Sequence, residues 1–108
     1  MSPIPHDFDR SLFSPSTIEL LRRVRDDAWR ELRLRQSPAA THEKEVGTHE
    51  ALAQAIVVLA AAGERDPQTL KRGAIAVIDA GQDAIASVAD RTEAQGLVDL
   101  VALLRSKI

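Results

Sequence analysis

Residues 63–67 read Gly-Glu-Arg-Asp-Pro, and this stretch divides the chain into helices more clearly than any other. Glycine readily adopts the left-handed backbone conformation that ends many helices. Aspartate followed by proline is typical of a helix start, because the carboxylate accepts a hydrogen bond from an exposed N–H group and proline has no N–H to leave unpaired. The stretch therefore predicts that one helix ends at Gly63 and that the next begins at Pro67.

The segment before this junction is densely apolar. A helix over about residues 49–62 has apolar side chains on more than one face, with Leu52 on one side and Val57 on another. Helices that are apolar nearly all round usually lie at the centre of a domain. Thr48 directly precedes the apolar run, and threonine is a good N-cap. We therefore expect a central helix that begins after Thr48, preceded by a polar loop over residues 39–47.

The segment after the junction has one apolar stripe at helical spacing, which runs from Leu70 to Val88 and passes through Gly81. Glycine inside a helix costs roughly 1 kcal/mol relative to alanine. The helix that begins at Pro67 therefore either continues through Gly81, or kinks or breaks there, and the sequence leaves both outcomes open.

Two other capping patterns mark the first and the last helix. Serine followed by proline at residues 14–15 predicts a helix over about residues 15–35. Thr92 and Gln95 have the spacing of a capping box, in which two side chains bind backbone N–H groups at the start of a helix. This spacing predicts a last helix over about residues 93–107.

These four predicted helices, five if the third is interrupted, account for most of the sequence. No stretch alternates apolar and polar residues as a half-buried strand does. The expected fold class is therefore all-α, a small four- to five-helix bundle, and 108 residues suffice for one such domain. Residues 1–13 are expected to form an extended N-terminal arm, and residues 14–108 a single helical domain. The candidate anchors of the arm are Phe8, Leu12 and Phe13.

The first two-thirds of the chain contain a recognisable pattern. It consists of Phe13-Ser-Pro-Ser-Thr-Ile18 with Leu21, Asp27-Ala28-Trp29, Leu52-Ala53 with Ile56, and Ala61-Ala62-Gly63-Glu64-Arg65-Asp66-Pro67 with Leu70. This pattern, over about residues 13–75, resembles a group of short helical proteins common in alphaproteobacteria. The resemblance implies a helical fold and a bacterial origin, and it implies no particular activity, cofactor or site residue.

Composition excludes several classes of protein. The chain has no cysteine, which rules out disulfides, thiolate metal ligands and cysteine nucleophiles. Its longest uncharged run, residues 51–63, is too short to cross the ~30 Å hydrocarbon core of a bilayer. The first ten residues lack the basic and apolar segments of a secretory signal. We therefore expect a cytoplasmic protein with no membrane contact.

No residue pattern indicates catalysis or a bound ion. Nucleophilic catalysis needs an activated side chain with a base in reach, and the chain has no motif of that kind. His42, Glu45 and His49 would share one face if their segment were helical, and could then bind a metal ion. Gly47 falls inside that segment, so we favour a polar loop there. The prediction is a protein that is not an enzyme and that holds no metal or cofactor.

The apolar residues indicate a thin core. Alanine is the commonest of them, and the aromatic residues are only Phe8, Phe13 and Trp29. Small side chains bury little area each, so burial against a partner would add much to stability. Tryptophan and arginine are enriched in interface hot spots. We therefore predict a protein–protein interaction module that self-associates, with a homodimer as the expected form. The predicted interaction residues are Trp29, Arg25, Arg33 and the outward-facing Leu103.

A nucleic-acid-binding regulator is the alternative function. Residues 15–35 carry six arginines, and arginine is a preferred phosphate ligand. The two helices predicted within residues 48–78 are joined by a short turn containing glycine, as in a helix-turn-helix. The net charge of −2 and the isoelectric point of about 5.9 count against this alternative, because DNA-binding domains are typically strongly basic.

Overall fold

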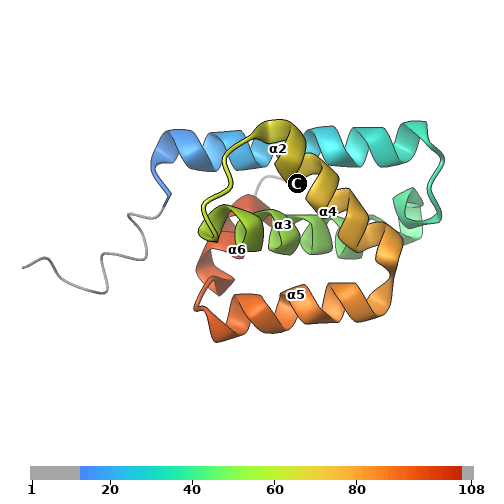
Figure 1. Ribbon diagram of the computed structural model, residues 1–108. Coiled ribbons are helices and arrows are strands. Elements are labelled where there is room, and N and C mark those ends of the chain that lie inside the picture. The colour runs from blue at the N-terminus through green and yellow to red at the C-terminus, as the bar shows by residue number, and fades with distance from the viewer. Residues whose placement is uncertain (1–12, 106–108) are drawn as a thin grey trace, which may run out of the picture.

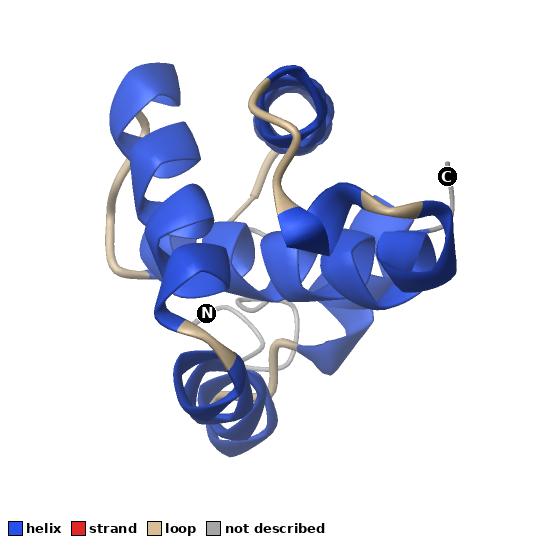
Figure 2. Ribbon diagram, turned by 90° about the vertical axis from the view of Figure 1, so that its right-hand side faces the viewer, coloured by secondary structure: helices blue, strands red, loops and turns tan. Residues whose placement is uncertain are grey.

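The computed structural model describes residues 13–105, and all regular elements in that range are helices, with no strand (Figures 1 and 2). The α-helices are α2 (Pro15–Leu34), α3 (Glu45–Ala61), α4 (Pro67–Ala80), α5 (Gln82–Ala94) and α6 (Val98–Arg105). Two short 3₁₀ helices, η1 (Pro38–Ala40) and η2 (His42–Lys44), connect α2 to α3. The all-α prediction of a small helical bundle is confirmed. None of the described helices has the length and apolar character needed to cross a bilayer.

Helix α3 lies at the centre of the bundle, as its sequence predicted. It packs against α2, α4, α5 and α6, and Figure 1 shows it between α2 and α5, with α4 crossing in front. Leu52 and Ile56 lie on one face of the helix and Val57 lies on another, yet all three are fully buried. A helix covered on all sides needs apolar residues on all sides, which accounts for the dense apolar run.

The junction that follows α3 has the predicted caps. Gly63 has a φ of 110°, and the Glu64 N–H donates to the Leu59 carbonyl at 3.1 Å, which closes the C-terminus of α3. At the start of α4, the Asp66 carboxylate accepts a hydrogen bond from the Thr69 N–H at 2.9 Å. Both helix ends are therefore satisfied by residues within five positions of them.

Gly81 breaks the long apolar stripe into two helices. Its φ of 102° and ψ of −168° lie outside the helical region, and residues with a side chain rarely adopt this φ. Helix α4 ends at Ala80, and α5 begins at Gln82. The sequence left open whether the helix continues through Gly81, and the structure shows a break there, so residues 13–105 form five α-helices.

The prediction that Thr48 caps the central helix is wrong. Helix α3 begins at Glu45, so Gly47 and Thr48 lie within it. The Thr48 side chain is buried, and its hydroxyl donates to the carbonyl of Ala39 in η1 at 2.7 Å. Because the first turn of α3 packs little apolar surface, the apolar pattern gave no sign of it. The expected polar loop over residues 39–47 is instead built largely from η1, η2 and this first turn.

The prediction that Thr92 starts the last helix is also wrong. Thr92 lies in the last turn of α5, where its hydroxyl donates to the Ala89 carbonyl at 2.7 Å. Gly96, with a φ of 70°, ends α5, and the Leu97 N–H donates to the Thr92 carbonyl at 2.7 Å. The glycine therefore ends one helix where the capping-box spacing predicted the beginning of another, and the last helix begins at Val98.

Phe13 marks the border between the predicted arm and the helical domain. Its side chain is buried in the core, and the Arg65 guanidinium lies 5.3 Å from the centre of its ring. Ser14 then caps α2 by accepting a hydrogen bond from the Thr17 N–H at 3.2 Å. The other two candidate anchors, Phe8 and Leu12, lie outside the described residues.

Candidate protein-interaction surface

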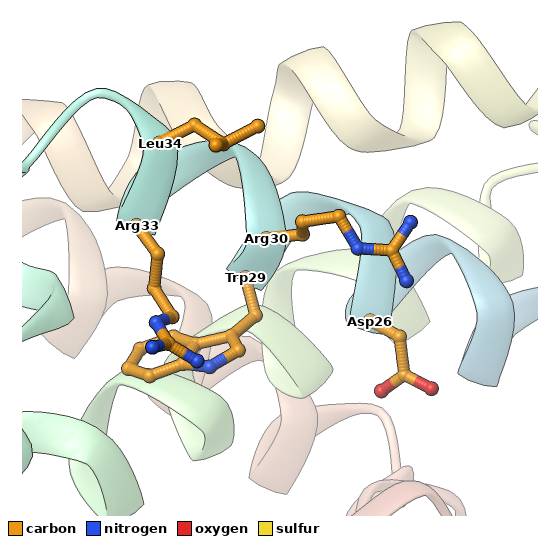
Figure 3. Close-up of a pocket in the computed structure, with 5 residues that line it drawn as sticks. All are labelled: Asp26, Trp29, Arg30, Arg33 and Leu34. Atoms are coloured by element: carbon orange, nitrogen blue, oxygen red, sulfur yellow. The ribbon is translucent and has the colours of Figure 1, made fainter.

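The outer face of α2 carries a shallow hollow with a volume of about 440 Å³ (Figure 3). Its lining residues are Asp26, Trp29, Arg30, Arg33 and Leu34. These residues follow one another at helical spacing, so they form one stripe along the outside of the helix. We call this stripe and its hollow the α2 surface.

Trp29 forms the inner wall of this surface. The indole ring is half-buried and packs on the His49 ring of α3, with 4.4 Å between ring centres and 40° between their planes. His49 itself is only 6 % exposed. One side of the indole therefore packs on buried His49, and the rest of the side chain faces the hollow. Figure 3 shows Trp29 and Arg33 extending from α2 in the same direction.

The charges around the hollow do not cancel. Asp26 accepts from the Arg25 guanidinium at 2.9 Å, and Arg30 lies 3.6 Å from the Asp27 carboxylate. Arg33 is exposed and forms no ion pair with any described residue. The α2 surface thus combines the indole ring of Trp29 with the Arg33 guanidinium, which has no counterion in the part of the chain that the structure describes.

Leu34 adds an apolar group to the same surface. Its side chain is 78 % exposed, the highest value among the large apolar residues described as exposed. Scattered exposed leucines are ordinary, but this one lines the same hollow as the half-buried Trp29, with its side chain pointing away from the indole in Figure 3. The sequence signal was present, because Leu34 is an apolar residue placed between Arg33 and Arg35.

The structure does not bring Arg25 to this surface. Its side chain is only 2 % exposed, and its guanidinium donates to the Leu104 carbonyl at the end of α6 and to the Asp26 carboxylate. A cation near the C-terminus of a helix satisfies carbonyls that have no partner within the helix. Arg25 therefore joins α2 to α6 and is not available as a contact for a partner.

Leu103 lies on α6 and is not among the residues that line the hollow. It is 43 % exposed on α6, and its carbonyl accepts a hydrogen bond from the Arg22 guanidinium at 3.1 Å. Arg22 precedes Trp29 by seven residues, which is about 10 Å along a helix. Of the four predicted interaction residues, the structure thus brings together Trp29 and Arg33 at one hollow and leaves Leu103 outside it.

The three residues considered as metal ligands do not meet. The His42 side chain is 99 % exposed and its Nδ1 lies 3.8 Å from Glu45, whereas His49 points inward against Trp29. The described residues contain no group of three side chains that could hold a metal ion. Burial, and after it the Arg25 guanidinium, lower the pKa of His49, whose Nδ1 has no hydrogen-bond partner in the described residues.

Most of the arginines on α2 and at its C-cap, Arg35, are engaged within the protein. Their partners are Glu19 and the Leu103 carbonyl for Arg22, Asp26 and the Leu104 carbonyl for Arg25, Asp27 for Arg30, and Asp79 for Arg35. Lys71, near the start of α4, lies 3.1 Å from Glu31 of α2. These cations largely tie α2 to its neighbours, which leaves Arg23 and Arg33 as the α2 arginines without an ion pair among the described residues.

Comparisons with known proteins assign no relative. The resemblance of residues 13–75 to short helical proteins of alphaproteobacteria stays a prediction. No protein-family model matches the chain, and neither the curated proteins nor the solved structures gave a significant match.

Proposed function

We propose that this protein is a small, non-enzymatic interaction module that self-associates through the α2 surface. The observation that supports this function is the grouping of half-buried Trp29, exposed Leu34 and unpaired Arg33 around one hollow. Aromatic residues and arginine are the types enriched at the energetic centre of protein interfaces. We expect it to act in the bacterial cytoplasm as a regulator, an adaptor or a subunit of an assembly.

The position of Trp29 suits it to be the anchor of an interface. Its ring is already fixed against His49, so binding would order few additional torsions of this side chain. Preorganised side chains lose less conformational entropy on association and so give more net affinity. Covering Leu34 would add roughly 25 cal/mol for each Å² of apolar surface removed from water.

The chemistry of the hollow favours binding over catalysis. All of its lining residues come from one helix, and they comprise one carboxylate, two guanidinium groups and two apolar side chains. Covalent catalysis needs a nucleophile within hydrogen-bond reach of a base, and this set offers no such pair. Enzyme pockets usually collect polar groups that converge from several elements.

Sedimentation over a series of protein concentrations tests the proposal. We expect a dimer or a larger species, and we expect Leu34→Glu to shift the protein toward the monomer because it places a charge at the apolar edge of the hollow. Val98→Glu is the matched control, since Val98 is an exposed apolar residue on α6 outside the hollow. Leu103→Glu tests whether the interface extends to α6.

A monomer at every concentration would contradict self-association. If that monomer also bound duplex DNA tightly, with affinity that falls steeply between about 50 and 200 mM salt, the nucleic-acid alternative would be favoured, because release of counterions produces that dependence. Circular dichroism of each variant verifies that the helical fold is retained.

A further inference from the structure

We propose that the hollow of the α2 surface receives the segment Asp7-Phe8-Asp9 from the N-terminal arm of a second copy of this chain. This inference rests on the proposed function, because it names the partner of the same surface. Two chains that exchange their arms reciprocally would close a two-fold dimer, the commonest form of symmetric assembly.

The hollow fits an aromatic ring flanked by carboxylates. Trp29 offers a ring surface, Leu34 an apolar edge, and Arg33 a guanidinium that forms no ion pair within residues 13–105. Aromatic rings pack favourably on one another in offset or edge-to-face geometry. Arginine binds carboxylates with paired hydrogen bonds. The volume of about 440 Å³ falls within the range of pockets that bind small groups.

The chain itself offers a segment with this chemistry. It has only three aromatic residues; Phe13 is buried in the core, and Trp29 already forms the wall of the hollow. Phe8 is the remaining one, and it is the one with an aspartate on each side. Asp7 and Asp9 would complement Arg33 and the neighbouring Arg30, which shares its charge with Asp27.

The length of the arm indicates that the segment comes from a second copy. Arg33 lies 18 residues beyond Pro15, which is about 27 Å along a helix. Asp7 precedes the buried Phe13 by six residues, and a fully extended chain of that length spans at most about 22 Å. The backbone of the same copy's arm therefore ends about 5 Å short of Arg33 even when it is pulled straight along α2, so a contact within one copy would need a fully extended arm and extended side chains. An arm from another molecule has no such limit.

The first test is sedimentation of the full-length Phe8→Ala variant. We expect its dimer dissociation constant to rise about thirtyfold, which is typical for loss of an aromatic anchor. His6→Ala, a change in the same arm outside the proposed segment, should leave the constant unchanged. Association of Phe8→Ala at wild-type strength would overturn the proposal.

The second test supplies the segment as a peptide. A synthetic peptide of residues 2–12 is titrated into full-length Phe8→Ala protein, and the fluorescence of Trp29 is recorded, since it is the only tryptophan in the chain and the peptide has none. We expect a saturable change in emission. A peptide with Asp7→Asn and Asp9→Asn, or protein that also carries Arg33→Glu, should bind at least about tenfold more weakly at low salt.

The two tests separate the failure of this inference from failure of the proposed function. If Leu34→Glu dissociates the protein while Phe8→Ala does not, the α2 surface mediates self-association and the arm is not its occupant. If Phe8→Ala weakens association but the peptide leaves Trp29 emission unchanged, Phe8 acts within its own copy and the inference is wrong. If the protein is monomeric and the peptide does not bind, both proposals fall.

Discussion

Two helix ends in this protein are satisfied in contrasting ways. At the start of α4, the Thr69 N–H is bound by the Asp66 carboxylate, three residues away. At the end of α6, the Leu104 carbonyl is bound by the Arg25 guanidinium, 79 residues away. The first contact can form as soon as the local turn forms, whereas the second requires α2 and α6 to have packed. Both helix ends have a backbone group without a partner inside the helix. At the start of α4 a residue nearby in the sequence binds it, whereas at the end of α6 a residue brought close by tertiary packing binds it.

The largest expected effect is the loss of the tertiary cap. Arg25→Met removes a buried guanidinium and leaves the Leu104 carbonyl without its donor, and we expect the free energy of unfolding to fall by about 2–3 kcal/mol, since hydrogen bonds to charged groups are strong. Urea denaturation measures this change. Arg23→Met, on the exposed side of the same helix, should alter stability by no more than about 0.5 kcal/mol. If Arg25→Met and Arg23→Met lowered the free energy of unfolding equally, the bond from Arg25 to the end of α6 would not be a special source of stability.

His49 gives the packed region a dependence on pH. Its pKa in the folded protein is lowered from the ordinary value of 6.5 by burial and by Arg25, so the unfolded chain takes up a proton more readily than the folded one. Stability is therefore full above about pH 6.5 and declines as the pH falls below that value. The urea midpoint, followed by Trp29 fluorescence, should fall with pH in the wild type.

A matched pair of substitutions checks this assignment. His49→Phe keeps an aromatic ring against Trp29 and should flatten the pH dependence between about pH 6.5 and 5, because no imidazole remains to be protonated there. His42→Gln should leave the dependence unchanged, since the His42 side chain is almost fully exposed. A pH profile that follows His42 would contradict the role given to His49.

The local cap should be less sensitive to substitution. Asp66→Ala removes the acceptor for the Thr69 N–H and should lower the urea midpoint by less than Arg25→Met does. Asp66→Asn should retain most of the stability, because asparagine caps helices about as well as aspartate. We expect neither variant to change self-association, as Asp66 lies outside the α2 surface. Loss of association in Asp66→Ala would show that the junction is itself a binding site.

The smallest expected effect tests the early start of α3. Gly47 lies inside the first turn of that helix, and a Cβ added there would meet no atom within 4 Å. Gly47→Ala should therefore raise the free energy of unfolding by about 0.5–1 kcal/mol, the usual gain for alanine over glycine in a helix. A destabilising effect in the same urea assay would support the loop that the sequence predicted.

The predicted interaction residues also differ in how far local spacing could place them. Trp29 and Arg33 were identified from residue type and spacing, and both line the hollow. Arg25 has the same residue type and a similar spacing, yet it is buried, because the end of α6 lies against it. Spacing alone places Val24 and Arg25 equally near the inner face of α2, and both are in fact buried. Arg25 is structural because its guanidinium bonds the Leu104 carbonyl, which lies 79 residues away in the sequence. Arg33, the candidate interface arginine, is exposed.

The sequence by itself determined the all-α class, the central position of α3 and the caps at Ser14, Gly63 and Asp66, because helical period and capping depend on residues a few positions apart. It misplaced the helix starts near Thr48 and Thr92. Each of these hydroxyls forms a hydrogen bond to a carbonyl, Ala39 in one case and Ala89 in the other, in place of a helix N–H group. The tertiary structure alone decided the burial of Arg25 and His49 and the grouping of Trp29 with Leu34, since these depend on where α3 and α6 pack against α2.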